Sequence, residues 1–172
     1  MKRLEGARGS LKEADYAWQA IAEGCPMAND TMRKFGFPDT MVRDFEHWAV
    51  LLRPSQVTLG SLVLAAKCNA TAFGELPDGA HAELAQVTAQ IEATLSEAIG
   101  YDRINYLMLM MVDPHVHFHV LPRYEGDRTF GDIRIADAGW PGPPDLATGR
   151  KLPDDLFEQL RLKLAERWSI CC

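Results

Sequence analysis

Cysteine, basic charge and long apolar runs are all scarce in this sequence, and each scarcity excludes a class of protein. The 172 residues contain four cysteines without a regular spacing, so we expect reduced thiols rather than a disulfide framework. Lysine and arginine number 18 against 24 acidic residues, and this balance argues against a nucleic-acid partner. No segment is apolar for long enough to predict a membrane span or the core of a signal peptide, so we predict a cytoplasmic protein without a membrane partner.

Apolar residues make up 47% of the chain, which is enough to predict one compact domain with its own core. Ser10 and Glu13 form a capping-box pattern, which predicts an N-terminal helix that ends at Gly24. The connector over 25–40 is rich in turn-forming residues, and we expect Phe35 and Phe37 to anchor it. An ordered loop is therefore expected between this helix and the rest of the domain.

Short apolar segments predict strands, and two longer segments with apolar residues at helical spacing predict helices. Strands are expected at 47–53, 59–67, 104–112 and 115–121, the first two antiparallel. A main helix is expected over 80–99, with Gly100 as its stop, and a last helix carries an apolar stripe of Leu156, Leu160, Leu164 and Trp168. A methionine group is expected to fill the core: Met108, Met110 and Met111. The segment from 125 to 150 fits a lid, a dimer contact or a strand pair.

The stretch DPHVHFHVLPRY, from Asp113 to Tyr124, places three of the five histidines at alternate positions. Side chains alternate between the two faces of a strand, so His115, His117 and His119 are expected on one face and apolar residues on the other. A single histidine on a sheet surface is usually an ordinary polar residue. Three in register behind an apolar face are a rarer arrangement, and they indicate a functional site.

Two kinds of chemistry suit alternate histidines. A metal ion binds imidazole nitrogens at about 2 Å, but the Cβ atoms of His115 and His119 are expected about 13 Å apart, which is too far for one ion. The other use is nucleophilic catalysis at phosphorus, in which a neutral imidazole attacks and its neighbours donate hydrogen bonds to the developing charge. We favour the second chemistry, which needs no metal and no cofactor.

The segment HVHFHVLPR resembles the histidine-triad signature His-φ-His-φ-His-φ-φ of nucleotide hydrolases and transferases. Upstream, VLLRPSQVTLGSLVLAAK is similar to the strand, turn, strand and lysine of that family. The resemblance implies a compact α+β domain with an antiparallel sheet of about five strands, one long central helix, extra N- and C-terminal helices, and commonly a homodimer. It divides the chain into an N-terminal helix and connector (1–30), a histidine-triad core (31–125), and a loop with a C-terminal helix on the same domain (126–172).

The same resemblance implies transfer of a nucleoside monophosphate from a small-molecule nucleotide to His117 and then to water. The implied substrates are nucleoside phosphoramidates, dinucleoside polyphosphates or similar phosphoesters. His119 would contact the phosphate or the leaving group, and His115 would help orient the site. Four further residues are predicted to bind substrate: Arg53, Ser61, Asn105 and Arg123.

Several positions depart from the family pattern. Ser61 stands where a histidine often supports the triad, and Met111 and Val112 replace two residues that donate to phosphate. Arg53 replaces an acid or amide that binds the ribose hydroxyls, and a guanidinium has donors only. The lost donors favour a first alternative, a catalytically weak protein of this fold that binds a nucleotide or phosphorylated metabolite.

A second alternative is a metalloprotein that uses His117 with His115 or His119. Some members of the family hold a structural zinc through Cys-x-x-Cys and two histidines. Here the segment CPMA keeps Cys25 but has Ala28 in place of the second cysteine. Cys68 and Asn69 occupy the region of the second-strand histidine. Too few ligands remain, and we predict no structural zinc.

Overall fold

The computed structural model describes residues 28–170. The helix expected over 10–24 lies outside these residues. Among the described residues, no helix combines the length and the apolar character needed to cross a membrane.

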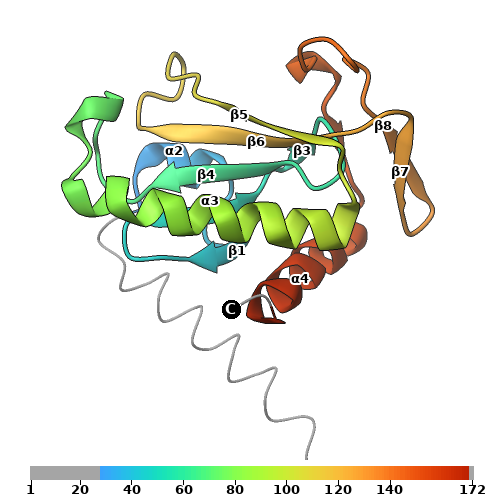
Figure 1. Ribbon diagram of the computed structural model, residues 1–172, viewed down its shortest axis with the longest axis horizontal. Helices are drawn as coiled ribbons and strands as arrows, with labels where there is room; N and C mark the ends of the chain where they lie inside the picture. The colour runs from blue at the N-terminus through green and yellow to red at the C-terminus, as the bar shows by residue number, and fades with distance from the viewer. Residues whose placement is uncertain (1–27, 171–172) are drawn as a thin grey trace, which may run out of the picture.

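A five-stranded antiparallel sheet forms the centre of the molecule (Figure 1). Its strands lie in the order β1 (Met41–Asp44), β2 (Trp48–Leu52), β4 (Leu62–Ala66), β6 (His117–Arg123) and β5 (Arg103–Leu107). The strands β2 and β4 are buried along their whole length, which explains why they read as continuous apolar runs in the sequence. The predicted α+β class with a five-stranded antiparallel sheet is confirmed.

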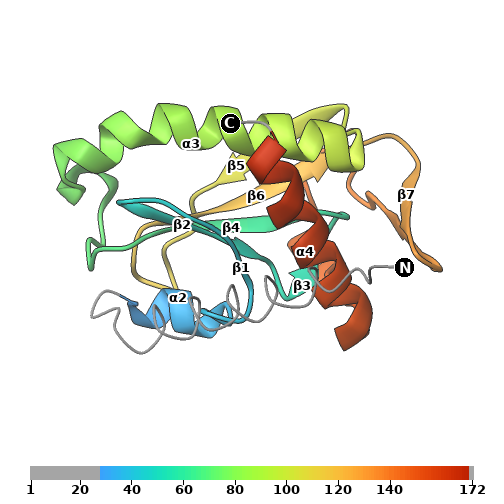
Figure 2. The same ribbon diagram turned by 90° about the horizontal axis from the view of Figure 1, so that it is seen from below.

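Helices cover both faces of this sheet, as Figure 2 shows. The long helix α3 (Asp78–Ile99) lies along one face and buries Val87, Ile91 and Leu95 against the strands. It ends at Gly100, whose φ of 67° is the left-handed conformation that glycine adopts without steric cost. The helix α4 (Asp154–Ile170) packs beside α3 and buries its predicted stripe at Leu160, Leu164 and Trp168.

The opposite face carries a short helix, α2 (Asp30–Lys34), within the segment expected to be an irregular loop. Asn29 caps this helix by accepting a hydrogen bond from the Met32 amide. Phe35 and Phe37 follow it and pack on the apolar residues of this face, so the predicted anchoring by these two rings is confirmed. Five helical residues are too few to show a periodic pattern, which is why the sequence did not predict α2.

The segment after β6 forms a strand pair, β7 (Asp127–Phe130) with β8 (Ile133–Ala136). A turn of 3₁₀-helix, η2 (Leu146–Thr148), then leads into β9 (Arg150–Lys151), which pairs with β3 (Ser55–Gln56). A second 3₁₀ turn, η1 (Phe73–Glu75), precedes α3. The strand pair β3–β9 joins the segment that precedes α4 to the loop between β2 and β4.

The third predicted strand is too long, and the expected role of its methionines is partly wrong. Pairing of β5 with β6 stops at Leu107 and His119, and residues 108–114 form a loop. Within it Met111 is 89% exposed and Met108 38% exposed, whereas Met110 packs against the core. An apolar run holds a strand only where a partner strand continues beside it, and β6 begins at His117 rather than at His115.

Candidate functional site

His117 and His119 lie on the sheet face that α2 covers. Their partners across the ladder, Ala65 and Val63, belong to the apolar cluster under α2. His117 is completely buried, and His119 is 7% exposed. The alternation predicted for the strand therefore holds for these two residues. It points both imidazole side chains into a site that is shielded from solvent.

The two imidazoles lie close to each other and under one aromatic ring. Their ring centroids are 5.1 Å apart, and the Phe35 ring centroid lies 5.6 Å from each of them. Lys34, the residue before Phe35, forms an ion pair with Asp113 at 2.5 Å, and this pair connects α2 to the loop before β6. The histidines are thus enclosed by an aromatic side chain and a loop, and polar interactions formed inside are little weakened by water.

One hydrogen bond determines the tautomer of His117. Its Nδ1 lies 2.8 Å from the backbone carbonyl oxygen of His115. A carbonyl oxygen can only accept, so Nδ1 carries the hydrogen. In the neutral ring, Nε2 then holds the lone pair. This Nε2 is buried and has no hydrogen-bond partner among the described residues, which leaves a nucleophilic nitrogen available.

His119 is neutral at physiological pH. Burial, together with the interactions with His117 and Arg53, lowers the pKa of His119 to about 4, while Asp113 opposes the shift. Its buried Nδ1 also lacks a partner among the described residues. A neutral imidazole still has one N–H donor, so His119 can donate a hydrogen bond to a phosphoryl oxygen.

His115 precedes β6 and has surroundings of its own. Its Nδ1 lies 3.1 Å from the Thr31 hydroxyl on α2, and His115 lines a cleft of about 440 Å³ together with residues of α2 and of the segment that follows β4. The contact to His117 comes from its backbone carbonyl. His115 therefore acts on the site through its main chain, while its side chain joins the loop before β6 to α2.

Arg53 stands next to the histidines at the end of β2. Its backbone amide donates to the Ser61 carbonyl at 3.0 Å, which continues the β2–β4 ladder by one residue. Its Nη1 donates to the Ser55 carbonyl, and its buried Nε has no partner among the described residues. Burial lowers the pKa of Arg53 from its usual value, so the guanidinium is partly removed from water.

Ser61 is occupied by its own loop. Its hydroxyl donates to the Thr58 carbonyl at 2.7 Å and accepts from the Thr58 amide at 3.0 Å. Gln56 accepts from the amides of Gly60 and Ser61 at 2.8 and 3.0 Å. The side chain is fully buried, and these contacts shape the turn between β2 and β4.

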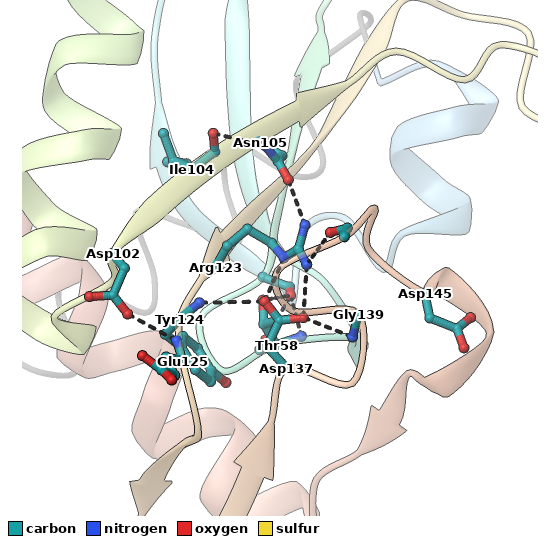
Figure 3. Close-up of polar contacts among 12 residues, drawn as sticks. Thr58, Asp102, Ile104, Asn105, Arg123, Tyr124, Glu125, Asp137, Gly139 and Asp145 are labelled. Atoms are coloured by element: carbon teal, nitrogen blue, oxygen red, sulfur yellow. Dashed lines mark hydrogen bonds and ion pairs between the residues drawn. The ribbon is translucent and has the colours of Figure 1, made fainter.

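Arg123 is the last residue of β6, and Asn105 lies on β5 opposite Leu121; both belong to the network of Figure 3. Arg123 Nε and Nη2 donate to the two carboxylate oxygens of Asp137 at 2.6 and 3.1 Å. Its Nη1 donates to Asn105 Oδ1 at 2.8 Å, and Nη2 also donates to the Gly142 carbonyl at 3.0 Å. The Cα atoms of Arg123 and His117 are roughly 20 Å apart at about 3.3 Å per residue. Arg123 is therefore far from His117, whereas Asn105 pairs with Leu121, two residues from His119, and its side chain is held by Arg123.

Unpartnered polar atoms are concentrated at the histidines. Within residues 28–170, five buried side-chain nitrogen or oxygen atoms have no hydrogen-bond partner, and three of them belong to His117, His119 and Arg53. Buried polar groups are normally paired, so a group of three at one place is typical of a site that a ligand completes. Among the same residues, no cluster of three histidine, cysteine, aspartate or glutamate side chains is arranged to hold a metal ion.

Thr31 and Phe35 also contribute to this site, and the sequence did not predict how. Thr31 contacts a histidine that lies 84 positions later in the chain. Such a pairing depends on where α2 docks and leaves no pattern in the sequence. The one local signal is Asn29, an N-cap residue just before α2.

A five-stranded antiparallel sheet, a long helix on one face and a histidine pair on the other are together the histidine-triad fold. Comparison with solved structures supports this: a histidine triad protein of Sinorhizobium meliloti superposes with a TM-score of 0.64 at 21% identity, over 81% of this chain and 95% of that one. A hypothetical histidine triad nucleotide-binding protein of Sulfolobus tokodaii gives 0.59 at 22% identity, over 76% and 84% of the two chains. A zinc-bound histidine triad family protein of Mycobacterium smegmatis gives 0.56 at 20% identity, over 78% and 86%.

In sequence, the chain is 28% identical over 110 residues to an uncharacterized HIT-like protein of Methanocaldococcus jannaschii, which covers 58% of this chain and 83% of that protein. No protein-family model matches the sequence. The predicted resemblance to the histidine-triad family is confirmed by this relative and by the shared fold.

Proposed function

We propose that the protein is a nucleotide hydrolase or nucleotidyl transferase that acts at phosphorus through a covalent intermediate on His117. The observation that carries this proposal is the hydrogen bond from His117 Nδ1 to the His115 carbonyl, because it leaves Nε2 as a buried lone pair. A relative in fold is described as a nucleotide-binding protein, which supports a nucleotide as the substrate. The nucleotide is a small molecule and no cofactor takes part.

In the proposed first step, His117 Nε2 attacks the phosphorus of a nucleoside phosphoramidate, dinucleoside polyphosphate or similar ester. A bond from phosphorus to Nε2 forms, and the bond from phosphorus to the leaving group breaks; the leaving group takes a proton from solvent. In the second step, water attacks phosphorus and loses a proton to solvent, the bond from phosphorus to Nε2 breaks, and the nucleoside monophosphate leaves His117 free. The imidazole thus divides one difficult displacement into two easier ones.

His119 stabilises the charge that develops on the phosphoryl oxygens by donating a hydrogen bond. The neutral His119 lies beside His117, with ring centroids 5.1 Å apart, and supplies an N–H donor. Arg53 supplies a positive charge that acts on His119. Both groups are held by the sheet before substrate binds, so little reorganisation is needed during the reaction.

The test is release of nucleoside monophosphate from a panel of phosphoramidates, dinucleoside polyphosphates and nucleotide sugars, with wild type and His117→Ala. Each assay is run with and without a chelator. The proposal expects turnover that resists the chelator and is lost in His117→Ala. Turnover that the chelator abolishes would point instead to metal chemistry.

A second candidate is a protein that binds a nucleotide or phosphorylated metabolite with little or no turnover. It is favoured by Met111 and Val112, which the resemblance places where two phosphate donors are expected. Both side chains are exposed on the loop before β6, at 89% and 82%. Tight nucleotide binding without turnover of any compound in the panel would favour this candidate.

A further inference from the structure

We propose that the substrate carries a second anionic group, in addition to the phosphoryl group attacked by His117, and that Arg53 binds it. This inference rests on the proposed function and adds the chemical class of the substrate. The second group is a phosphate ester or a carboxylate, and Arg53 is the residue that selects for it.

Arg53 is a partly buried arginine without a carboxylate partner among the described residues, on the sheet face that carries the histidines. Within residues 28–170, six arginines form ion pairs with carboxylates: Arg33, Arg123, Arg128, Arg134, Arg161 and Arg167. Arg53 forms none, although it is half-buried and its Nε is fully buried. Arg43, Arg103 and Arg150 form none either within this range. Arg43 also has a buried Nε without a partner in the same range, but its guanidinium lies over the Phe45 ring and its strand partner Val50 packs on the other face of the sheet, away from the histidines. An exposed arginine is stabilised by water, but a partly desolvated guanidinium without a counter-ion is unfavourable unless an anion completes it.

The position of Arg53 directs that anion to the histidine site. Along β2 and β4 the ladder pairs Leu52 with Leu62 and then Arg53 with Ser61. Arg53 therefore lies on the same face as Val63, which is the partner of His119. The positive charge of Arg53 also contributes to the lowered pKa of His119, after burial and the interaction with His117.

The guanidinium is also held in place. Its Nη1 donates to the Ser55 carbonyl on β3, and β3 is paired with β9. Gly149, just before β9, packs so closely that an added Cβ would lie 2.3 Å from Ser55 Oγ and 3.3 Å from Arg53 Nη1. Gly149 and β9 thus hold Arg53 in place. An arginine that is already held in place loses little conformational entropy when it binds an anion.

The donor set of Arg53 defines the ligand chemistry. A guanidinium has five N–H donors and no acceptor, in a planar arrangement that matches two oxygens of a phosphate or carboxylate. A pair of neutral sugar hydroxyls does not supply the missing counter-charge. The favoured substrate therefore has an anionic group on its sugar or on its leaving group.

The test uses two pairs of substrates that differ in one charge. The first pair is adenosine 5′-phosphoramidate with and without a 3′-phosphate. The second is an amino-acid phosphoramidate of adenosine with its carboxylate free or converted to a carboxamide. Together they distinguish a sugar phosphate from a leaving-group carboxylate as the source of the second anion.

We expect wild type to prefer the doubly anionic member of one pair by about 10- to 100-fold in kcat/KM, the range for a charge-assisted hydrogen bond pair. Arg53→Met should reduce this preference to less than about threefold, and Arg53→Lys should retain part of it because the charge remains. Arg103→Met is the matched control, because Arg103 is exposed on β5 opposite Arg123 and should leave the preference unchanged. A preference absent from both pairs in wild type, or one that survives in Arg53→Met, overturns the inference.

Failure of the proposed function is distinguishable from failure of this inference. If wild type turns over none of the four compounds, they serve as ligands for calorimetry. Tighter binding of a doubly anionic member by about 10-fold, lost in Arg53→Met, supports the anion site without catalysis. Equal binding within both pairs overturns the inference whatever the catalytic result.

Discussion

The polar side chains at the two ends of β6 differ in whether their hydrogen bonds are made within the protein. At the start of the strand, His117 Nε2 and His119 Nδ1 are buried without hydrogen-bond partners among the described residues. Toward its end, Arg123 has 4% of its side chain exposed, and its three guanidinium nitrogens all donate to protein oxygens. Both ends lie on the same face of the same strand.

This contrast distinguishes a ligand site at the histidines from a structural ion pair between Arg123 and Asp137, which we call the clamp. A buried polar group without a partner costs free energy of about 1 to 3 kcal/mol, and it is retained where a ligand supplies the partner. A buried ion pair whose hydrogen bonds are all made holds its surroundings in place instead. Here the clamp joins β6 to Asn105 on β5 and to the loop at Asp137 and Gly142 (Figure 3).

The largest expected effect comes from breaking the histidine end. His117→Ala should lower kcat for the proposed reaction by about 10⁴-fold or more, because the nucleophile is removed. Asn105→Ala is the comparison at the other end and should lower kcat less than about threefold. Steady-state kinetics with the best substrate of the panel measures both. A large rise in KM for Asn105→Ala would support the predicted substrate-binding role of Asn105.

Breaking the clamp should affect stability more than catalysis. Asp137→Ala should lower the free energy of unfolding by about 3 to 5 kcal/mol, because it leaves the buried Arg123 without its counter-ion. Asp145→Ala is a control on the same loop: Asp145 is exposed and accepts from the Ala147 amide, so its loss should cost about 1 kcal/mol. Urea denaturation measures both, and equal losses would contradict the assignment of Arg123 as a clamp.

Acid should weaken the histidine end in particular. The pKa of His119 is about 4 in the folded protein and near 6.5 when unfolded, so the unfolded state takes up its proton first as pH falls between these values. The free energy of unfolding should therefore fall between pH 7 and pH 4, with about 3 kcal/mol of that fall due to His119. His119→Gln should show a fall smaller by this amount in urea denaturation at the two pH values. An identical fall in the variant would mean that His119 is accessible to protons in the folded state.

The smallest effect is expected at the cover of the histidine site. Lys34 pairs with Asp113, but half of the Lys34 side chain is exposed. Lys34→Ala should therefore lower the free energy of unfolding by less than about 1 kcal/mol, and 1 M salt should remove most of the difference. A loss as large as that for Asp137→Ala would show that the two ends are held with similar strength.

Much of the fold could be predicted from the sequence because its main elements carry strong local patterns. The strands β2 and β4 are continuous apolar runs, and α3 shows an apolar face ended by Gly100. The helix α2 and the strands β3 and β9 are too short for such patterns. The end of β5 was misplaced because apolar residues continue into the loop that follows it.

The site could be predicted in part for the same reason. The alternate spacing of His117 and His119 is local, and it identified the face they share. The partners that distinguish a free group from an engaged one are distant in sequence: Asp137 lies 14 positions from Arg123, and Thr31 lies 84 positions from His115. The homodimer and the domain boundaries at 30 and 125 stay predictions.

The most direct test of the central claim is a search for the covalent intermediate. Wild type is mixed with adenosine 5′-phosphoramidate for a few turnovers, denatured in alkali to preserve phosphorus–nitrogen bonds to histidine, and measured by intact-protein and peptide mass spectrometry. The proposal expects the mass of one nucleoside monophosphate on the peptide that contains His117, and none in His117→Ala. Turnover that persists in His117→Ala at the wild-type rate would contradict it.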